Sequence, residues 1–215
     1  MLKLYDYSRS SAAYRVRIGL NLKGVDYQSV PINLLKDEQS GAAYRAINPQ
    51  ARVPALQTPH GILTQSLSIL AWLDQTYPDP PFMPADPWEQ ALVRAFALTI
   101  GADIHPLNNL AVLDRLKAQF GADEAAIASW YLHWIEQGFA ALEAQLAARP
   151  ETAFAFGDQP TLADICLVPQ CVNARRFKFD FSNTPRLAAI DARARAHPAF
   201  EKAAPKNQPD AIKRN

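Results

Sequence analysis

Pro78-Asp79-Pro80-Pro81-Phe82-Met83-Pro84-Ala85-Asp86-Pro87 is the stretch that divides this sequence into two parts. It holds five prolines in ten positions, and proline fits neither the interior of a helix nor that of a central strand. We therefore expect a stiff connection here, not a helix or a strand. The expected organisation is a domain at residues 1–81, a proline-rich linker at 82–87 and a second domain at 88–215.

The first part alternates strand-like runs with helical ones. Strands are predicted at residues 2–7, 27–32, 56–58 and 62–64, the last two as a hairpin around Pro59-His60-Gly61. A helix between the first two strands is expected to end at Gly24, a typical C-terminal cap, and another is expected to begin at Ser66 as its N-cap. The expected order is β-α-β, a loop with a short helix, then β-β-α.

Beyond the linker the pattern is helical, without a convincing strand. Helices are predicted at residues 88–104, 110–120, 122–146, 162–177 and 186–197. Thr161 and Asp164 fit a capping box, in which the acid reaches back to the first backbone N–H, and we assign this pair to folding. The fold class is therefore α/β plus all-α.

Composition excludes several classes of function. Hydrophobic residues make up 49% and charged residues 20% of the chain, and the net charge is +1. This balance does not favour nucleic acid or an anionic membrane as a partner. No apolar run reaches the length of a membrane span, and the N-terminus lacks the apolar segment of a signal peptide, so a cytoplasmic location is expected.

Cysteine and histidine spacing indicates neither a metal site nor a dithiol. Cys166 and Cys171 are the only cysteines and lie five positions apart, which is not C-x-x-C. The four histidines are scattered without zinc-ligand spacing. We expect no metal, and any reactive thiol at the first strand must come from outside the chain.

Several segments, in order along the chain, resemble the zeta class of glutathione transferases, whose best-known members are maleylacetoacetate isomerases. They are Arg9-Ser10-Ser11-Ala12-Ala13-Tyr14-Arg15-Val16-Arg17-Ile18, Pro31-Ile32-Asn33-Leu34, Asn48-Pro49 with Val53-Pro54, Gln65-Ser66-Leu67, Ile104-His105-Pro106-Leu107, and Leu167-Val168-Pro169-Gln170 followed by Asn173-Ala174-Arg175-Arg176-Phe177. The resemblance implies a thioredoxin-like first domain, an all-helical second domain, glutathione as cofactor, a small diacid substrate and a homodimer.

Ser10 and Ser11 fall in the turn between the first strand and the first helix. A helix N-terminus carries free N–H groups and a partial positive charge, so a thiol bound there has a lowered pKa and is more often the reactive thiolate. A serine hydroxyl donating to the sulfur stabilises it further. Ser10 is predicted as the thiolate donor, and Ser11 as the helix cap with a glutathione contact. The resemblance adds Tyr14 and Arg15 as cofactor contacts.

Other cofactor contacts come from loops and helix starts. Val53-Pro54 resembles the cis-proline of thioredoxin-like folds, whose preceding residue presents its backbone to an extended ligand. Gln65 and Ser66 begin a helix and suit a carboxylate, which the resemblance identifies as the γ-glutamyl end of glutathione. By the same resemblance, Gln39, His105 and Asn109 are further candidate contacts.

Two arginines are predicted on the substrate side. Guanidinium groups bind carboxylates bidentately, so Arg9 and Arg176 suit a small diacid. Arg176 is preferred over Arg175, because it matches the arginine of the family pattern. Arg9 is also assigned to catalysis with Ser10.

The prediction is therefore a glutathione-dependent cis–trans isomerase converting maleylacetoacetate to fumarylacetoacetate. One departure from the family pattern bears on the substrate, because Ala12 replaces a cysteine and Tyr14 replaces a tryptophan. Related maleylpyruvate isomerases also lack that cysteine, so maleylpyruvate is the nearest alternative. A transferase that conjugates glutathione to haloacids or other electrophiles, and a non-catalytic interaction module, are the remaining alternatives.

Overall fold

The computed structural model describes residues 1–211 and divides into two compact units. The first combines Met1–Pro81 with the chain from Ala196 onward, and the second is Phe82–Arg195. This division differs from the expected domains, which placed the chain from Ala196 onward in the second one. Each unit is described by itself below.

The first unit contains a four-stranded mixed sheet with the strand order β2-β1-β3-β4. Its strands are β1 (Leu2–Asp6), β2 (Tyr27–Pro31), β3 (Ala55–Thr58) and β4 (Gly61–Thr64). β1 runs parallel to β2 and antiparallel to β3, and β3 forms the predicted hairpin with β4. All four strands lie within about a residue of their predicted positions.

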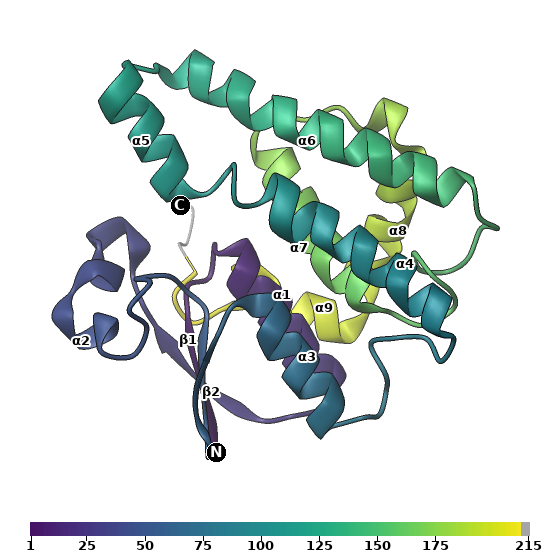
Figure 1. Ribbon diagram of the computed structural model, residues 1–215, viewed down its shortest axis with the longest axis horizontal. Coiled ribbons are helices and arrows are strands. Elements are labelled where there is room, and N and C mark those ends of the chain that lie inside the picture. Colours follow the sequence, from purple (N-terminus) through teal and green to yellow (C-terminus); the bar gives the residue numbers. More distant parts are fainter. Residues whose placement is uncertain (212–215) are drawn as a thin grey trace. The chain divides into compact units, whose positions relative to one another are not determined.

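Helices cover both faces of this sheet. α1 (Ser11–Leu22) and α3 (Ser66–Thr76) lie on one side, and α2 (Ala42–Arg45) lies on the other, as Figure 1 shows. Side chains alternate along a strand, so β1 places Leu2, Leu4 and Asp6 on its fully buried face. Tyr5 has the opposite parity and meets Tyr44 of α2, with ring centroids 6.0 Å apart. The sheet with its helices is the predicted thioredoxin-like arrangement.

The C-terminal segment, residues 196–211, belongs to the first unit because it covers α1. α9 (Pro198–Ala203) packs on α1, where the Tyr14 hydroxyl donates to Phe200 O at 3.3 Å and Arg17 Nε donates to Ala203 O at 2.9 Å. Nearly every residue from Ser11 to Leu20 is buried, so α1 needs cover on more than its sheet-facing side. The short α9 supplies that cover, and the sequence analysis did not predict it.

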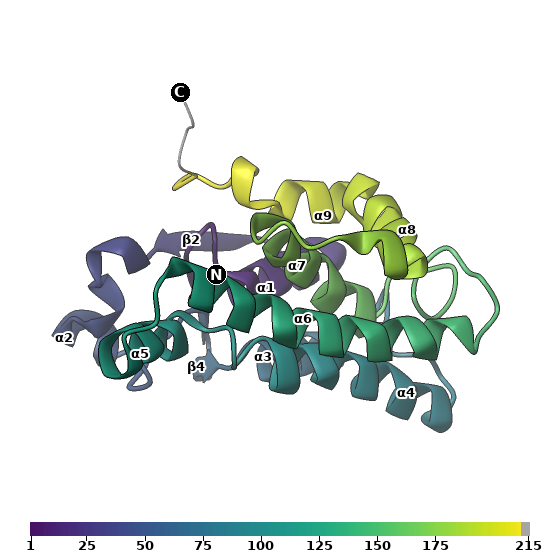
Figure 2. The ribbon, with the colours of Figure 1, turned by 90° about the horizontal axis from the view of Figure 1, so that it is seen from above.

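The second unit is helical, as predicted. Its elements are α4 (Pro87–Leu98), the π-helical turn η3 (Thr99–Ile104), α5 (Leu110–Phe120), α6 (Glu124–Ala147), α7 (Leu162–Arg176), the short 3₁₀ turn η4 (Phe181–Asn183) and α8 (Pro185–Ala196). Figure 2 shows the long helix α6 running alongside α4. The described residues include no helix long and apolar enough to cross a membrane.

The single helix predicted at 88–104 changes to π-helix at Thr99. The Thr99 hydroxyl donates to Ala95 O at 3.1 Å, and such a bond competes with the regular helical pattern. The wider turn brings Ile104 against Gly138 of α6, where an added Cβ would lie only 2.2 Å from Ile104 Cδ1. Gly138 therefore permits the close approach of η3 to α6.

The predicted capping box at the start of α7 is confirmed. Asp164 accepts the Thr161 backbone N–H at 2.8 Å and its hydroxyl at 2.9 Å, and also the Ala155 N–H at 2.8 Å. Complete burial raises the pKa of the Asp164 carboxyl to about 6, although these hydrogen bonds lower it.

Candidate functional site

The N-terminus of α1 follows a tight turn after β1. Ser10 N–H donates to Tyr7 O at 2.9 Å, and Ser10 is then the N-cap, with Oγ accepting the Ala13 N–H at 3.2 Å. Ser11 is the first helical residue and is buried. The predicted cap was Ser11, and this was wrong by one position because Ser10 has the extended backbone that an N-cap needs.

Capping does not use up the Ser10 hydroxyl. A serine hydroxyl carries two acceptor lone pairs and one donor, and the bond from Ala13 takes only an acceptor position. The first turn of α1 contains no acidic residue that would neutralise the helix dipole. This helix end therefore suits an anion to which Ser10 Oγ–H can donate.

Arg15 links the starts of α1 and α3. Its guanidinium is buried, and Nη1 donates to Ser66 Oγ at 3.3 Å. This contact brings together two residues predicted to bind the cofactor, and it places a positive charge beneath the start of α3. Tyr14 differs, because its hydroxyl is directed to α9 and Arg17 lies over its ring at 5.3 Å. That geometry gives Tyr14 a packing role.

The N-cap of α3 is Gln65, whereas Ser66 was predicted to fill that position. Gln65 has φ 67°, in the left-handed region that a non-glycine residue adopts only at a cost. Its amide Nε2 donates to Gln50 Oε1 at 2.9 Å. Ser66 is therefore the first residue of α3, and the first turn of α3, like that of α1, contains no acidic residue.

The peptide bond between Val53 and Pro54 is cis, as predicted. It lies directly before β3, beside a loop that is organised by Asn48. Asn48 Nδ2 donates to Arg52 O at 2.6 Å, and Asn48 Oδ1 accepts the Gln50 N–H at 3.1 Å. Gln50 in turn contacts Gln65, so this loop and the start of α3 form one cluster.

The remaining predicted residues of the first unit lie nearer the surface. Arg9 is exposed in the turn before α1. Gln39 lies in the short 3₁₀ turn η2 (Glu38–Ser40), where its Nε2 donates to Asp37 Oδ1 at 2.7 Å. The amide of Gln39 is thus used within its own turn.

In the second unit, His105 and Asn109 border the loop between η3 and α5. Asn109 is the N-cap of α5, with Oδ1 accepting the Ala111 N–H at 3.1 Å. The loop is held by α6, because Trp130 Nε1 donates to Leu107 O at 2.9 Å and Asn108 Nδ2 donates to Tyr131 O at 3.1 Å. Half-buried His105 follows η3 directly, so the contact of Ile104 with α6 also sets its position.

The two arginines at the end of α7 differ in their surroundings. Arg175 forms an ion pair with the buried Asp191 and lies over the Phe181 ring, so its role is structural. Arg176 is exposed, and its charge acts on Tyr131, whose pKa burial raises to about 12 while Arg176 lowers it. Tyr131 stacks on Phe177, with ring centroids 3.7 Å apart. The role of Arg176 as the ligand-binding arginine stays a prediction.

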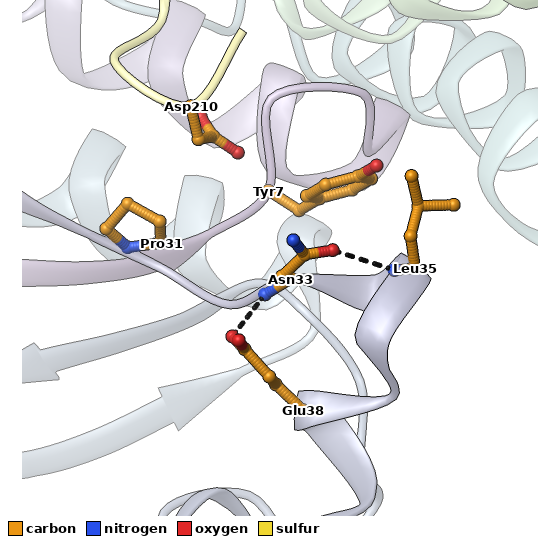
Figure 3. A pocket seen from close by; sticks show the side chains of 6 residues that line it. All are labelled: Tyr7, Pro31, Asn33, Leu35, Glu38 and Asp210. Carbon is orange, nitrogen blue, oxygen red and sulfur yellow. Dashed lines mark hydrogen bonds between the residues drawn. The ribbon is translucent and has the colours of Figure 1, made fainter. Parts of the chain in front are cut away.

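The sequence analysis missed a buried polar group beneath the turn that carries Arg9 and Ser10. Arg17 is fully buried and pairs with Asp6 at 2.6 Å, and burial raises the pKa of the Asp6 carboxyl more than Arg17 lowers it. Asp210, from the C-terminal segment, accepts the Ser8 N–H at 2.9 Å. Asp210 and Tyr7 line one cavity, which has a volume of about 260 Å³. Figure 3 shows both side chains. Arg17 belongs to the segment that resembles the family, but its pairing with Asp6 in the core has no local sequence signal, and the Ser8–Asp210 contact spans 202 positions.

Comparison with known proteins agrees with this fold. Residues 4–81 match the family model of the glutathione S-transferase N-terminal domain, and residues 110–202 match that of the C-terminal domain. The chain therefore belongs to the glutathione S-transferase family.

Particular relatives narrow the class further. A maleylpyruvate isomerase from Ralstonia is 48% identical over 97% of this chain and 99% of its own length. A maleylacetoacetate isomerase from Pseudomonas aeruginosa is 47% identical over 97% of this chain and 98% of its own length.

Solved structures give the same result. A holo structure of maleylpyruvate isomerase, a bacterial zeta-class enzyme, matches with a TM-score of 0.96 and 48% identity, covering 98% of this chain and all of that one. A maleylacetoacetate isomerase from Anaeromyxobacter dehalogenans, solved with glutathione in its active site, matches with a TM-score of 0.89 and 41% identity, covering 99% and 98%.

Proposed function

We propose that this chain is a glutathione-dependent cis–trans isomerase that converts maleylacetoacetate to fumarylacetoacetate. The observation that carries the proposal is the start of α1, where the Ser10 hydroxyl caps a helix end that has no acidic side chain. The high identity to isomerases of cis-unsaturated diacids supports this assignment.

Glutathione, when bound, supplies a thiolate that adds reversibly to the double bond of the substrate and so permits rotation about it. In this proposal Ser10 and the N-terminus of α1 keep the sulfur ionised. Gln65 and Ser66 hold the γ-glutamyl carboxylate, and the buried Arg15 adds positive charge beneath them.

Backbone and substrate contacts complete the assignment. The Val53 backbone, before the cis-proline, pairs with the extended peptide part of the cofactor. Arg9 and Arg176 each bind a carboxylate of the diacid and orient it, and orientation of this kind supplies a large part of enzymatic rate enhancements. His105 and Asn109 are also proposed as cofactor contacts, whereas Tyr14 has a packing role.

A second candidate substrate is maleylpyruvate. The specific observation is Ala12, which stands two residues after Ser10 where the family pattern has cysteine, together with the similarity to the Ralstonia enzyme. The chemistry is the same, and the difference lies in the length of the diacid.

A coupled spectrophotometric assay with both diacids, with and without glutathione, tests these proposals. We expect isomerisation that needs glutathione but leaves the free thiol concentration unchanged, with maleylacetoacetate the better substrate by kcat/KM. Thiol consumption without isomerisation would instead identify a conjugating transferase. Absence of glutathione binding in calorimetry would support a non-catalytic module.

We also propose a cytoplasmic homodimer. Both parts of this proposal rest on the family to which the chain belongs. Sedimentation equilibrium tests the assembly, and a mass of about 24 kDa instead of twice that value would contradict it.

A further inference from the structure

The turn that carries Arg9 and Ser10 is held by residues outside the site. Ser8 is fully buried, although it precedes the exposed Arg9. Its N–H donates to Asp210 Oδ2 at 2.9 Å, and its hydroxyl donates to Asp210 O at 3.3 Å. On the other side, Ser8 O accepts Arg17 Nη2 at 3.0 Å. Every polar group of Ser8 is therefore hydrogen bonded.

Both partners of Ser8 are themselves fixed. Arg17 is held by the Asp6 carboxylate at 2.6 Å and by Ala203 O at 2.9 Å, and Nη1 also reaches Tyr7 O at 3.4 Å. The segment before Asp210 is tied to the end of α9, because Gln208 Nε2 donates to the carbonyls of Lys202 and Ala204 at 2.9 and 3.0 Å. The turn thus has a rigid support formed by the C-terminal segment.

We propose that Asp210 is a positioning residue for the isomerisation, which acts by fixing Ser8 and thereby the Arg9–Ser10 turn. This inference rests on the proposed function of Ser10. Ser10 lies two positions after Ser8, and a buried N–H that loses its acceptor forces a local rearrangement. A displacement of about 1 Å in a catalytic group is enough to lower a rate by about 100-fold.

If Asp210 acts by positioning, its removal should shift the pKa of bound glutathione in the direction opposite to that expected from loss of its charge alone. Removal of a nearby negative charge would lower the pKa of glutathione bound at Ser10, because the thiolate would feel less repulsion. Displacement of Ser10 would raise that pKa, because the thiolate would lose its donor. Asp210→Ala removes both the charge and the acceptor, whereas Asp210→Asn removes the charge and keeps an acceptor oxygen for Ser8.

The experiment compares Asp210→Ala, Asp210→Asn and the control Asp180→Ala. Asp180, in the other unit, likewise accepts a serine N–H with its carboxylate, that of Ser182, and also accepts the Ser182 hydroxyl. We measure kcat, the ultraviolet titration of bound glutathione, thermal unfolding and amide exchange of residues 8–13. For Asp210→Ala we expect kcat to fall about 10- to 100-fold, the glutathione pKa to rise and the Ser8 amide to exchange about tenfold faster.

Asp210→Asn should restore kcat to within about threefold of the parent, and Asp180→Ala should match the parent. Unchanged kcat and exchange in Asp210→Ala would overturn the inference, as would an Asp210→Asn variant as slow as Asp210→Ala. A lower glutathione pKa in Asp210→Ala would show a charge effect and also overturn it. If the parent isomerises neither diacid, the proposed function fails, and the exchange of Ser8 and the titration of bound glutathione still decide whether Asp210 fixes the turn.

Discussion

The N-termini of α1 and α7 are both capped by a hydroxyl residue, but they differ in whether an acidic side chain lies in the first turn. Ser10 Oγ accepts the Ala13 N–H in α1, and the Thr161 hydroxyl and N–H donate to Asp164 in the capping box of α7. In α7 the acidic Asp164 lies within that turn and is completely buried, so the helix end supplies its own anion. In α1 no acid lies in the first turn, and the positive end of the helix stays available to an anion from outside.

The other helices extend this comparison. α3 begins like α1, without an acid in its first turn. α4 and α6, in the second unit, begin like α7, with Asp86 and Glu89 in one and Asp123 and Glu124 in the other. α5 and α8 also lack an acid in the first turn, so this absence leaves a helix end open to an anion but does not by itself identify a binding site.

The strongest test of the comparison is Ser10→Ala. Loss of the hydroxyl donor is expected to lower kcat about 100- to 1000-fold, whereas loss of the cap lowers the free energy of unfolding by only about 1 kcal/mol. Thr161→Ala is the matched control in α7, and it should lower stability by a similar amount with kcat unchanged. Steady-state kinetics and urea unfolding measure both variants. A Ser10→Ala enzyme as fast as the parent would remove Ser10 from the mechanism.

Asp164, the acid in the first turn of α7, should affect how stability depends on pH. Because the folded pKa of Asp164 is about 6 and the ordinary value is 3.8, the folded state binds this proton more tightly. The contribution of Asp164 to the free energy of unfolding therefore falls as pH rises from about 4 to about 6, by about 3 kcal/mol, and is constant above that range.

Urea unfolding of the parent, Asp164→Asn and Asp180→Asn between about pH 3 and 7 measures this change. The advantage of the parent over the variant should shrink as pH rises. Asp180 supplies a control of opposite sign, because hydrogen bonds from Ser182 lower its pKa, so its contribution is lost as pH falls below 3.8. A parent advantage over Asp164→Asn that is independent of pH would contradict the assigned pKa.

The other end of α7 provides a test in which a structural and a functional residue are adjacent. Arg176→Glu should raise the KM for the diacid about 10- to 100-fold, because a carboxylate loses its guanidinium partner. Arg175→Ala should instead lower stability through loss of the Asp191 ion pair and leave KM near the parent value. Equal KM values in all three proteins would exclude Arg176 from the substrate site.

The smallest effect is expected for a substitution that gives the start of α1 an acid, as at the start of α7. Ala12→Asp places a carboxylate in the first turn, where it competes with the bound thiolate for the helix dipole. We expect the affinity for glutathione to fall about three- to tenfold in calorimetry. Ala12→Asn has the same shape without the charge and should bind as the parent does. If both variants bind equally well, the missing acid is irrelevant to anion binding.

Sequence patterns predicted most of the fold because its boundaries have local causes. Gly24 has φ 63° after α1, and α5 begins and ends at the predicted residues. The errors came where long-range contacts decide: Gln65 adopts a backbone that its residue type disfavours, and the π-helical turn depends on Gly138 of α6. α9 is only six residues long, which is too short to show a periodic pattern.

The residues of the candidate site also fall into those with a local cause and those that depend on long-range contacts. Ser10, Val53 and Pro54 were predictable because each belongs to a motif with a local backbone conformation, and the cis bond was confirmed. The support from Arg17, Asp6 and Asp210 was not predictable, because charged residues are ordinarily expected at the surface. Their burial follows from contacts that only the folded chain contains.

The contact between Ser8 and Asp210 spans 202 positions of the chain. During synthesis at about 5 to 20 residues per second, the turn after β1 must wait about 10 to 40 seconds for its acceptor to be made. The reactive turn is therefore one of the first segments to be synthesised and one of the last to be completed. A nascent chain can form the sheet early, yet it gains a fixed Ser10 only when the C-terminal segment arrives.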